Sequence, residues 1–149
     1  MNPSETVRRL GLIPHPEGGF YREMFRSPAP VALPDGRIRS ASTAILYLLP
    51  SDEWSTWHRV TSDEVWHHYE GAPLRLYCLG HGEVVLNQQH PQAVVPGGCW
   101  QAAEPIGGPV LCGCTVAPGF EFEDFEMGTR EALLREFPAD QALIDRLTR

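Results

Sequence analysis

Short runs of apolar and β-branched residues fill the middle of the chain, and turn-forming residues separate nearly all of them. Turns such as Pro50-Ser51-Asp52 and Gly80-His81-Gly82 recur at the spacing of roughly 8–12 residues that is typical of all-β domains. No helical period lies between the runs, so the crossover helices of a parallel sheet have no room. The pattern predicts an all-β sandwich or barrel with antiparallel strands. Its expected strands cover residues 41–49, 54–60, 64–70, 73–79, 83–86, 92–95, 99–103 and 110–117.

The N-terminal third of the chain mixes a helix signal with loop signals. Ser4 can cap a short helix over residues 5–10, and Gly11 can end it. Alternation over residues 20–26 predicts a further strand. The proline-rich stretch after it contains a Pro-Asp-Gly turn and predicts a hairpin connection.

After Gly119 the spacing of the apolar residues changes to one that predicts helices. Thr129 is expected to cap a helix that ends near Phe137, and Pro138 is expected to open a second helix. We expect both C-terminal helices to pack on the outside of the barrel. Before them, residues 120–126 alternate aromatic and acidic side chains, which predicts phenylalanines buried beneath a charged face.

Length and charge narrow the functional classes. A chain of 149 residues fits one domain over residues 1–149. Its net charge of −7 argues against nucleic acid and against an anionic membrane surface as partners. No apolar run is long enough to span a membrane, and the N-terminus lacks a signal-peptide core, so we expect a cytoplasmic protein. The four cysteines are then expected to stay reduced.

The densest chemistry lies in WHRVTSDEVWHHYEG (57–71) and PGGCWQ (96–101). His58 ends one expected strand and Glu64 begins the next. If these strands form a hairpin, the two side chains lie side by side. Gln101 would then join them from a third strand. An imidazole, a carboxylate and an amide would thus share one enclosed polar pocket, the usual form of a small-ligand site in a barrel.

These two segments resemble the motifs of the cupin superfamily. Val60 and Gln101 stand where the superfamily motifs have histidines. Longer segments extend the resemblance to the narrower DUF985 (Cupin_5) family over nearly the whole chain: IPHPEGGFYRE, STAILYLL, SDEVWHHYEGAPL, PQAVVPGGCWQAA and GCTVAPGFEFEDFE. The positions that match the superfamily motifs are His58, Glu64, Gly71, Pro96 and Gly98.

The resemblance implies a cupin jelly-roll barrel, also called a double-stranded β-helix, and a homodimer, since many cupins are dimers. It also implies a possible divalent metal, for which His58, Glu64 and Gln101 are the candidate ligands. One imidazole and one carboxylate fall short of the two-histidine, one-carboxylate set of non-haem iron sites. A site with a metal and a site without one therefore both stay open.

Three functions are compatible with these residues. In the first, His58 and Glu64 are an acid–base pair in a metal-independent isomerase, epimerase or lyase that acts on a small carbohydrate- or nucleotide-like molecule. The second is a non-catalytic module that binds a small molecule, with Gln101 as hydrogen-bond donor and acceptor. The third is a metal-dependent oxygenase. A His58–Glu64 pair that only ties two strands together is the structural alternative to all three.

Strand alternation and loop composition add neighbours to the pocket. Side chains at even positions after Glu64 share its face, and a bulge would exchange the two faces. The adjacent glycines at 18 and 19 allow close backbone approach, so side chains beside them can point into the barrel mouth. Three loop histidines, His15, His81 and His90, are expected to be solvated. The expected ligand contacts are Gln101, Glu17, Tyr21, Trp66 and His68, with His67 as a secondary candidate.

Overall fold

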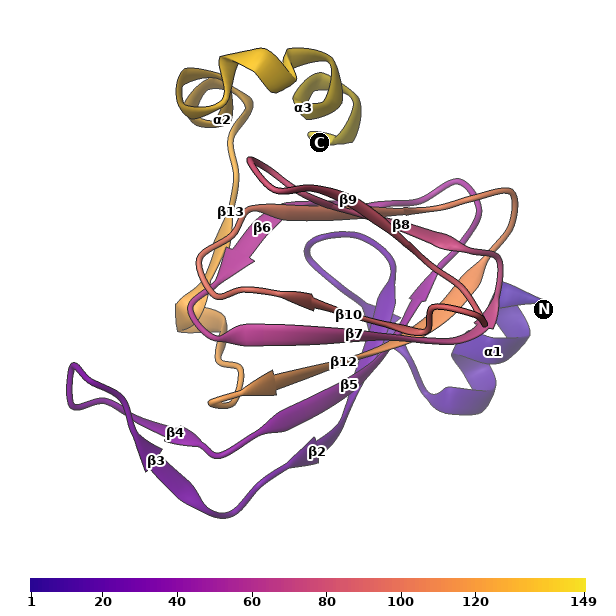
Figure 1. Cartoon of the computed structure of the whole chain (residues 1–149). Coiled ribbons are helices and arrows are strands. Elements are labelled where there is room, and N and C mark those ends of the chain that lie inside the picture. Colours follow the sequence, from indigo (N-terminus) through magenta and orange to yellow (C-terminus); the bar gives the residue numbers. More distant parts are fainter.

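Two antiparallel sheets face each other in the fold (Figure 1). Alternate side chains along their strands are buried between the sheets or lie on the outer faces. The computed structural model describes residues 1–149. The two sheets confirm the predicted all-β class and form a sandwich. The six-stranded sheet has the order β1 (Ile13–Pro14), β2 (Phe20–Arg26), β5 (Thr43–Leu49), β12 (Val110–Ala117), β7 (Asp63–Gly71) and β10 (Gln92–Val95). The five-stranded sheet has the order β13 (Phe125–Met127), β6 (Ser55–Val60), β11 (Gln101–Pro105), β8 (Leu74–Cys78) and β9 (Gly82–Leu86).

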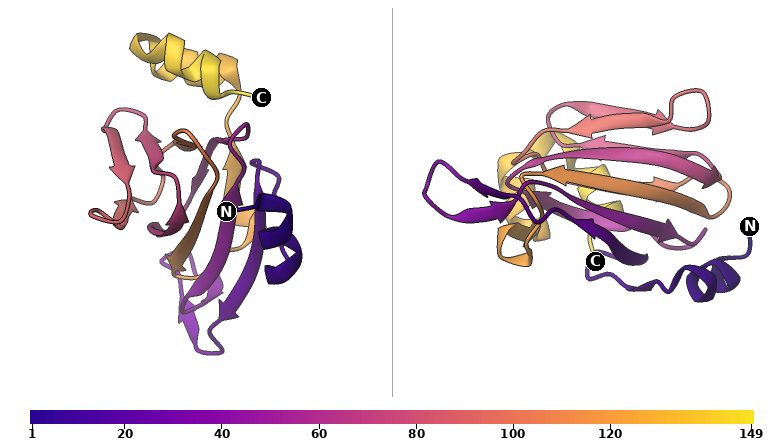
Figure 2. Two further views of the ribbon diagram at one scale, coloured as in Figure 1. Left: turned by 90° about the vertical axis from the view of Figure 1, so that its right-hand side faces the viewer. Right: turned by 90° about the horizontal axis from the view of Figure 1, so that it is seen from below.

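The remaining elements lie outside the two sheets (Figure 2). Helix α1 is capped by Asn2 instead of Ser4, because the Asn2 side chain reaches the backbone N–H of Glu5 at 3.1 Å. Thr129 caps α2 as predicted. These elements are α1 (Pro3–Leu10), the β3 (Pro30–Ala32) and β4 (Ile38–Ser40) hairpin, η1 (Phe122–Asp124), α2 (Arg130–Glu136), η2 (Pro138–Asp140) and α3 (Gln141–Leu147).

The connection between β6 and β7 differs from the predicted hairpin. The two strands belong to different sheets, and β7 pairs with β12 and β10 instead. The turn after Val60 carries the chain across the sandwich, where Gly98 N–H binds the Val60 carbonyl at 2.8 Å. His58 and Glu64 therefore face each other from opposite sheets, and both side chains are buried in the interior.

Three hydrophobic clusters hold the layers together. The largest lies between the sheets and includes Tyr47 and Trp66. A second joins the outer face of the five-stranded sheet to α2 and α3, so the C-terminal helices do pack outside the barrel (Figure 1). Its helix side chains Leu133, Ile144 and Leu147 are almost completely buried. The third lies where α1 covers the outer face of β5.

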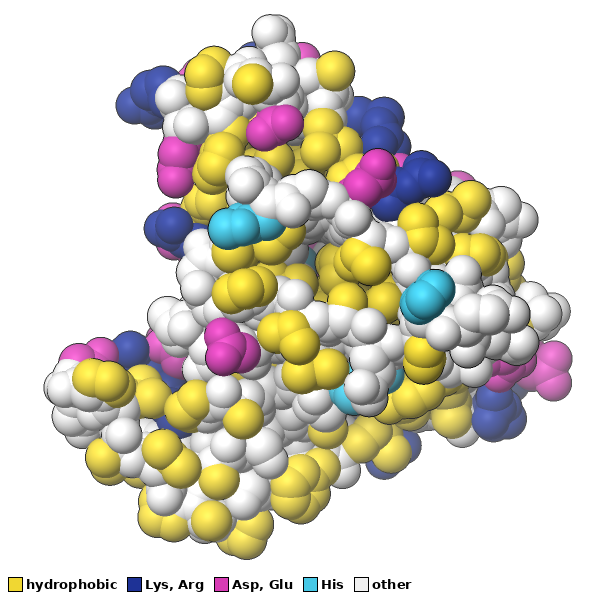
Figure 3. Space-filling model, viewed as in Figure 1, with side chains coloured by type: hydrophobic (Ala, Val, Ile, Leu, Met, Phe, Trp, Pro, Cys, Tyr) yellow, Lys and Arg dark blue, Asp and Glu magenta, His cyan; other side chains and the backbone are white.

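The alternating aromatic and acidic segment is only partly buried, contrary to the prediction. Phe122 is 48% exposed, because η1 turns the chain at this point and places the ring at the edge of the sandwich. Other exposed apolar side chains include Met24 and Ile38 near the β3–β4 hairpin, where hydrophobic atoms gather at the lower left of Figure 3. All four cysteines are free thiols. None of the helices has the length and apolarity needed to cross a bilayer.

Candidate functional site

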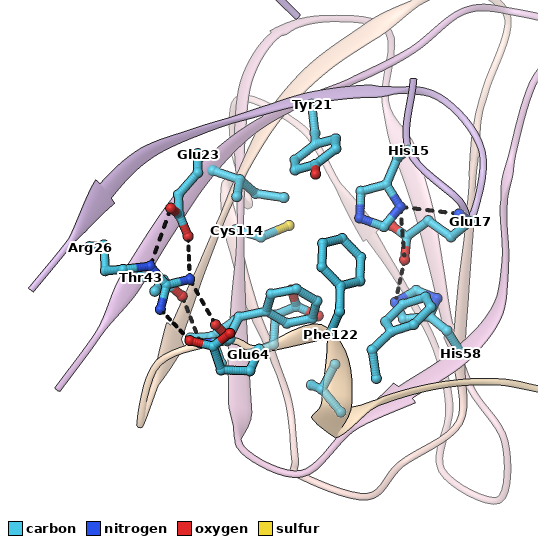
Figure 4. Close-up of a pocket in the computed structure, with 16 residues that line it drawn as sticks. His15, Glu17, Tyr21, Glu23, Arg26, Thr43, His58, Glu64, Cys114 and Phe122 are labelled. Carbon is cyan, nitrogen blue, oxygen red and sulfur yellow. Dashed lines mark hydrogen bonds and ion pairs between the residues drawn. The ribbon is translucent and has the colours of Figure 1, made fainter. Parts of the chain in front are cut away.

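A cavity of about 190 Å³ opens between the two sheets at the end where β2, β6 and β12 meet the aromatic segment (Figure 4). A cavity of this size suits a small ligand. Figure 4 shows His15, Glu17 and His58 on one side of it, and Glu23 and Arg26 on the other. The lining residues are His15, Glu17, Tyr21, Glu23, Arg26, Thr43, Ile45, His58, Val60, Glu64, Cys114, Val116, Phe120, Glu121, Phe122 and Phe125.

A buried ion pair forms the inner wall of the cavity. Glu17 Oε2 lies 3.0 Å from His58 Nε2, and both side chains are almost fully buried. The other ring nitrogen, Nδ1, lies 2.8 Å from the carbonyl oxygen of Thr56 and donates to it. Burial opposes the charge on His58, but attraction to Glu17 and the hydrogen bonds outweigh it and raise the pKa of His58 to about 9. His58 is therefore an imidazolium at neutral pH, with both N–H groups engaged.

The same pairing acts on the carboxylate. Burial alone would raise the pKa of Glu17, but the charge and hydrogen bond of His58 lower it below the ordinary value. The charges on Glu17 and His58 thus stabilise each other. This contact was not anticipated from the sequence, where the expected partner of His58 is Glu64.

Glu64 has a different environment on the opposite sheet. Gln101 Nε2 donates to Glu64 Oε1 at 2.8 Å, and Trp66 Nε1 donates to Gln101 Oε1 at 2.9 Å. Burial is the main influence on this carboxyl group, and it raises the pKa of Glu64 to about 7 against the attraction of His58. Glu64 can consequently gain and lose a proton near neutral pH, as an acid–base group requires.

The glycine pair places Glu17 by bringing the loop backbone close to β6. A Cβ on Gly18 would lie 2.2 Å from the Trp54 carbonyl oxygen, and the Gly18 φ of +111° also excludes ordinary side chains. The Glu17 carbonyl accepts from Thr56 N–H at 2.8 Å. The Gly19 N–H donates to the Glu53 carboxylate at 2.8 Å. These contacts hold the Glu17 side chain in the cavity, the position predicted from the sequence.

His15 is part of the site, although we expected it to be solvated. Its side chain is only 6% exposed, and its Nδ1 accepts from Glu17 N–H at 3.1 Å. Burial lowers the pKa of His15, so the ring is neutral and carries its proton on Nε2. Tyr21 lies beside it with ring centroids 4.6 Å apart. The placement of His15 two residues before Glu17 is the sequence signal that could have indicated it. His81 and His90 are exposed, as predicted.

The other predicted contacts divide between the cavity and its surroundings. Tyr21 lines the cavity, while Trp66 and Gln101 lie behind Glu64 and hold it. His68 shares their inward face, but it lies outside the cavity lining and its Nε2 contacts the Ala72 carbonyl at 2.9 Å. His67 lies on the outer face, 3.0 Å from the Thr115 hydroxyl. Neither of these two histidines reaches the cavity.

Comparison with known proteins agrees with this architecture. The family described as Cupin superfamily (DUF985), Cupin_5, matches residues 4–128. The chain belongs to this family. No curated protein matches it.

Three solved structures extend the comparison to the whole cupin fold. A hypothetical protein from Leishmania major is 30% identical, with a TM-score of 0.91 over 97% of each chain. A protein from Shewanella oneidensis is 35% identical, with a TM-score of 0.87 over 100% of this chain and 98% of the other. A cupin 2 conserved barrel domain protein from Rhodopseudomonas palustris is 14% identical, with a TM-score of 0.66 over 89% of this chain and 81% of the other, which shows the shared fold alone.

The metal ligands expected of a cupin do not fit this DUF985 site. His58 Nε2 is turned to Glu17, and Gln101 Oε1, its only metal-binding atom, accepts from Trp66. No group of three or more histidine, cysteine, aspartate or glutamate side chains is arranged to hold a metal ion. The candidate set of His58, Glu64 and Gln101 thus lacks a shared coordination point.

Proposed function

We propose that this cupin binds a small polar molecule in the cavity and catalyses proton transfer at a carbon next to a carbonyl group. Isomerases, epimerases and lyases share this step. The proposal rests on one observation: Glu64, a buried carboxyl group whose pKa is about 7, lines a cavity opposite a fixed imidazolium. A general base whose pKa matches the working pH is the most effective one.

Glu64 is better suited than His58 to move the proton. Oε1 of Glu64 accepts a hydrogen bond from Gln101. Oε2 accepts no hydrogen bond from a protein N–H or O–H group. The Cys114 thiol lies beside the carboxyl group. Both nitrogens of His58, by contrast, are hydrogen-bonded to protein oxygens. Glu64 therefore takes the acid–base role that the sequence predicted for His58 and Glu64 together.

The His58–Glu17 ion pair lines the cavity with fixed charges of both signs, and His58 is its positive member. When a base removes a proton next to a carbonyl group, negative charge develops on the carbonyl oxygen. A preorganised cation in a water-poor site stabilises that charge without reorganising. The neutral ring of His15 can donate from Nε2 to the same oxygen. The carbonyl group of the ligand is thus expected on the side of the cavity that holds these two rings.

Solvent deuterium exchange tests the proposal without knowledge of the product. Hydroxyacetone, dihydroxyacetone and glyceraldehyde are incubated with the protein in D₂O, and loss of the α-proton signal is followed by ¹H NMR. The wild-type protein should accelerate exchange in at least one of them. Glu64→Gln should lose roughly 10²–10⁴-fold of that acceleration, the usual contribution of a general base.

Glu70→Gln is the matched control, because Glu70 lies on the same strand but is exposed to solvent. It should exchange at the wild-type rate. Equal rates in Glu64→Gln and wild type would disprove the role of Glu64. Saturable thermal stabilisation by these compounds without any exchange would instead support a non-catalytic binding module.

A further inference from the structure

The mouth of the cavity combines aromatic rings with an excess of carboxylates. Phe120, Phe122 and Phe125 pack with interplanar angles of 72–81° and centroids 5.0–6.1 Å apart. Phe122 remains 48% exposed although it lines the cavity. An exposed aromatic face in a ligand cavity is attractive to cations, because the ring face is electron-rich.

The acidic groups at the mouth outnumber the cation that they surround. Arg26 pairs with Glu23 at 2.7 Å and with Glu121 at 2.8 Å. All three residues line the cavity. One arginine cannot neutralise two carboxylates, so the mouth keeps a formal charge of −1. Farther in, the cation of His58 is already balanced by Glu17.

Arg26 has little capacity left for an anionic ligand. Its guanidinium makes four hydrogen bonds, to both oxygens of Glu23, to Glu121 and to the Phe120 carbonyl. A guanidinium has five N–H groups, so at most one remains for a phosphate or carboxylate. This occupancy disfavours a nucleotide-like ligand.

From these contacts we infer that the ligand of this cavity is a small organic cation, a molecule with an amine or onium group, whose charge lies at the mouth between Phe122 and the Glu23–Glu121 carboxylates. This inference rests on the proposed function. It specifies that the substrate of the proposed reaction carries a positive charge. With the cationic group at the mouth, the reacting carbon of the same ligand lies in the inner part of the cavity, beside Glu64 and His58. The nine-tenths-buried Glu64 carboxyl marks that inner part as a ligand site.

Three probes of nearly equal shape separate charge from size. Choline carries a positive charge, 3,3-dimethylbutan-1-ol is its neutral carbon isostere, and 3,3-dimethylbutanoate is an anionic relative. Dissociation constants are measured for the wild-type protein by NMR titration at low salt. Choline should bind roughly tenfold more tightly than the neutral alcohol, the ratio expected when a cation meets an aromatic face and a net negative charge. The anion should bind more weakly than either.

Two variants at the mouth test where the cation lies. Phe122→Leu removes the exposed ring, and Glu121→Gln removes the excess charge. Each should lower the choline-to-alcohol preference by roughly three- to fivefold. Phe25→Leu is the control, because Phe25 is also exposed (52%) but does not line the cavity, and it should keep the wild-type preference. Circular dichroism checks that each variant is folded.

Equal affinity for the three probes, tighter binding of the alcohol or the anion, or no binding of choline would overturn the inference. None of these results bears on proton transfer, because Phe122 and Glu121 are not the proposed acid–base groups. The exchange rate of Glu64→Gln, whether it falls or stays at the wild-type value, is measured separately from the binding of the probes. The binding and exchange measurements therefore distinguish failure of one proposal from failure of the other.

Discussion

Glu17 and His58 are joined across a loop and a strand by an ion pair whose oxygen and nitrogen lie 3.0 Å apart. Neither side chain is more than 6% exposed. The pair has a structural role as well as an electrostatic one, because each charge is stable in the interior only while the other is present. Replacing His58 alone is consequently a poor test of catalysis.

The first prediction concerns the stability of this pair. His58→Gln should lower the free energy of unfolding by roughly 3–5 kcal/mol, because it leaves the Glu17 carboxylate buried without a partner. Glu17→Gln should cost a similar amount. The double variant should lose clearly less than the sum of the two, and urea unfolding at pH 7 measures all three. Additive losses would show that the two side chains are not coupled.

The second prediction concerns pH and follows from two raised pKa values. Glu64 has a pKa of about 7 in the folded protein against an ordinary 4.5, and His58 has about 9 against 6.5. Both groups hold their protons more tightly in the folded state, so both favour folding at low pH. Their contributions are lost as the pH rises, that of Glu64 from about 4.5 to 7 and that of His58 from about 6.5 to 9.

Thermal unfolding at pH 5, 7 and 9 measures this effect. The wild-type Tm should fall over this range, less steeply below pH 7, where the lowered pKa of His15 makes stability rise with pH. Glu64→Gln should remove most of the fall between pH 5 and 7, a difference on the order of 2–3 kcal/mol. The scan stops at pH 5, because the lowered pKa of Glu17 makes stability fall at lower pH. A Glu64→Gln protein with an unchanged slope would contradict the raised pKa.

Most of the fold could be predicted from the sequence, because the turn residues mark where strands end. The strand expected over residues 110–117 is β12, and that over residues 92–95 is β10. Inward and outward positions on β7 also follow the predicted alternation as far as His68. These features depend on local backbone preferences and on a period of two, which one sequence is enough to reveal.

The partners in the site could not be predicted in the same way. His58 and Glu64 do share an interior, but they come from opposite sheets, and a two-sheet sandwich and a hairpin give the same local pattern. Pairing of His58 with Glu17 depends on how the N-terminal loop crosses β6, a long-range contact without a local signature. The burial of His15 was missed for the same reason.

The third prediction concerns the glycine that places Glu17. Gly18→Ala should destabilise the protein by roughly 2–4 kcal/mol, because it combines an unfavourable φ of +111° with a Cβ 2.2 Å from the Trp54 carbonyl. Gly36→Ala is the matched control: its φ is +87°, but no atom lies within 4 Å of the added Cβ. The control should cost only about 1–2 kcal/mol. Equal losses, measured by urea unfolding, would mean that the close approach does not constrain the loop.

The fourth prediction concerns Gln101, which connects Trp66 to Glu64. Its amide N–H lowers the pKa of Glu64 by donating to the carboxylate, although burial keeps the pKa high overall. Gln101→Leu removes that donor and keeps the space filled. The pKa of Glu64 should then rise by roughly one unit, since a hydrogen bond of about 1–2 kcal/mol to the charged form is lost. Proton transfer by Glu64 should move to higher pH by the same amount.

A ¹³C NMR titration of the glutamate carboxyl groups measures this shift, and the resonance missing in Glu64→Gln identifies Glu64. Gln92→Leu is the control, because Gln92 is exposed and contacts only His67 on the outer face. It should leave the Glu64 titration unchanged. A pKa that stays near 7 in Gln101→Leu would show that burial alone sets it. In that case Gln101 would hold Trp66 in place and contribute nothing to the acid–base chemistry of the cavity.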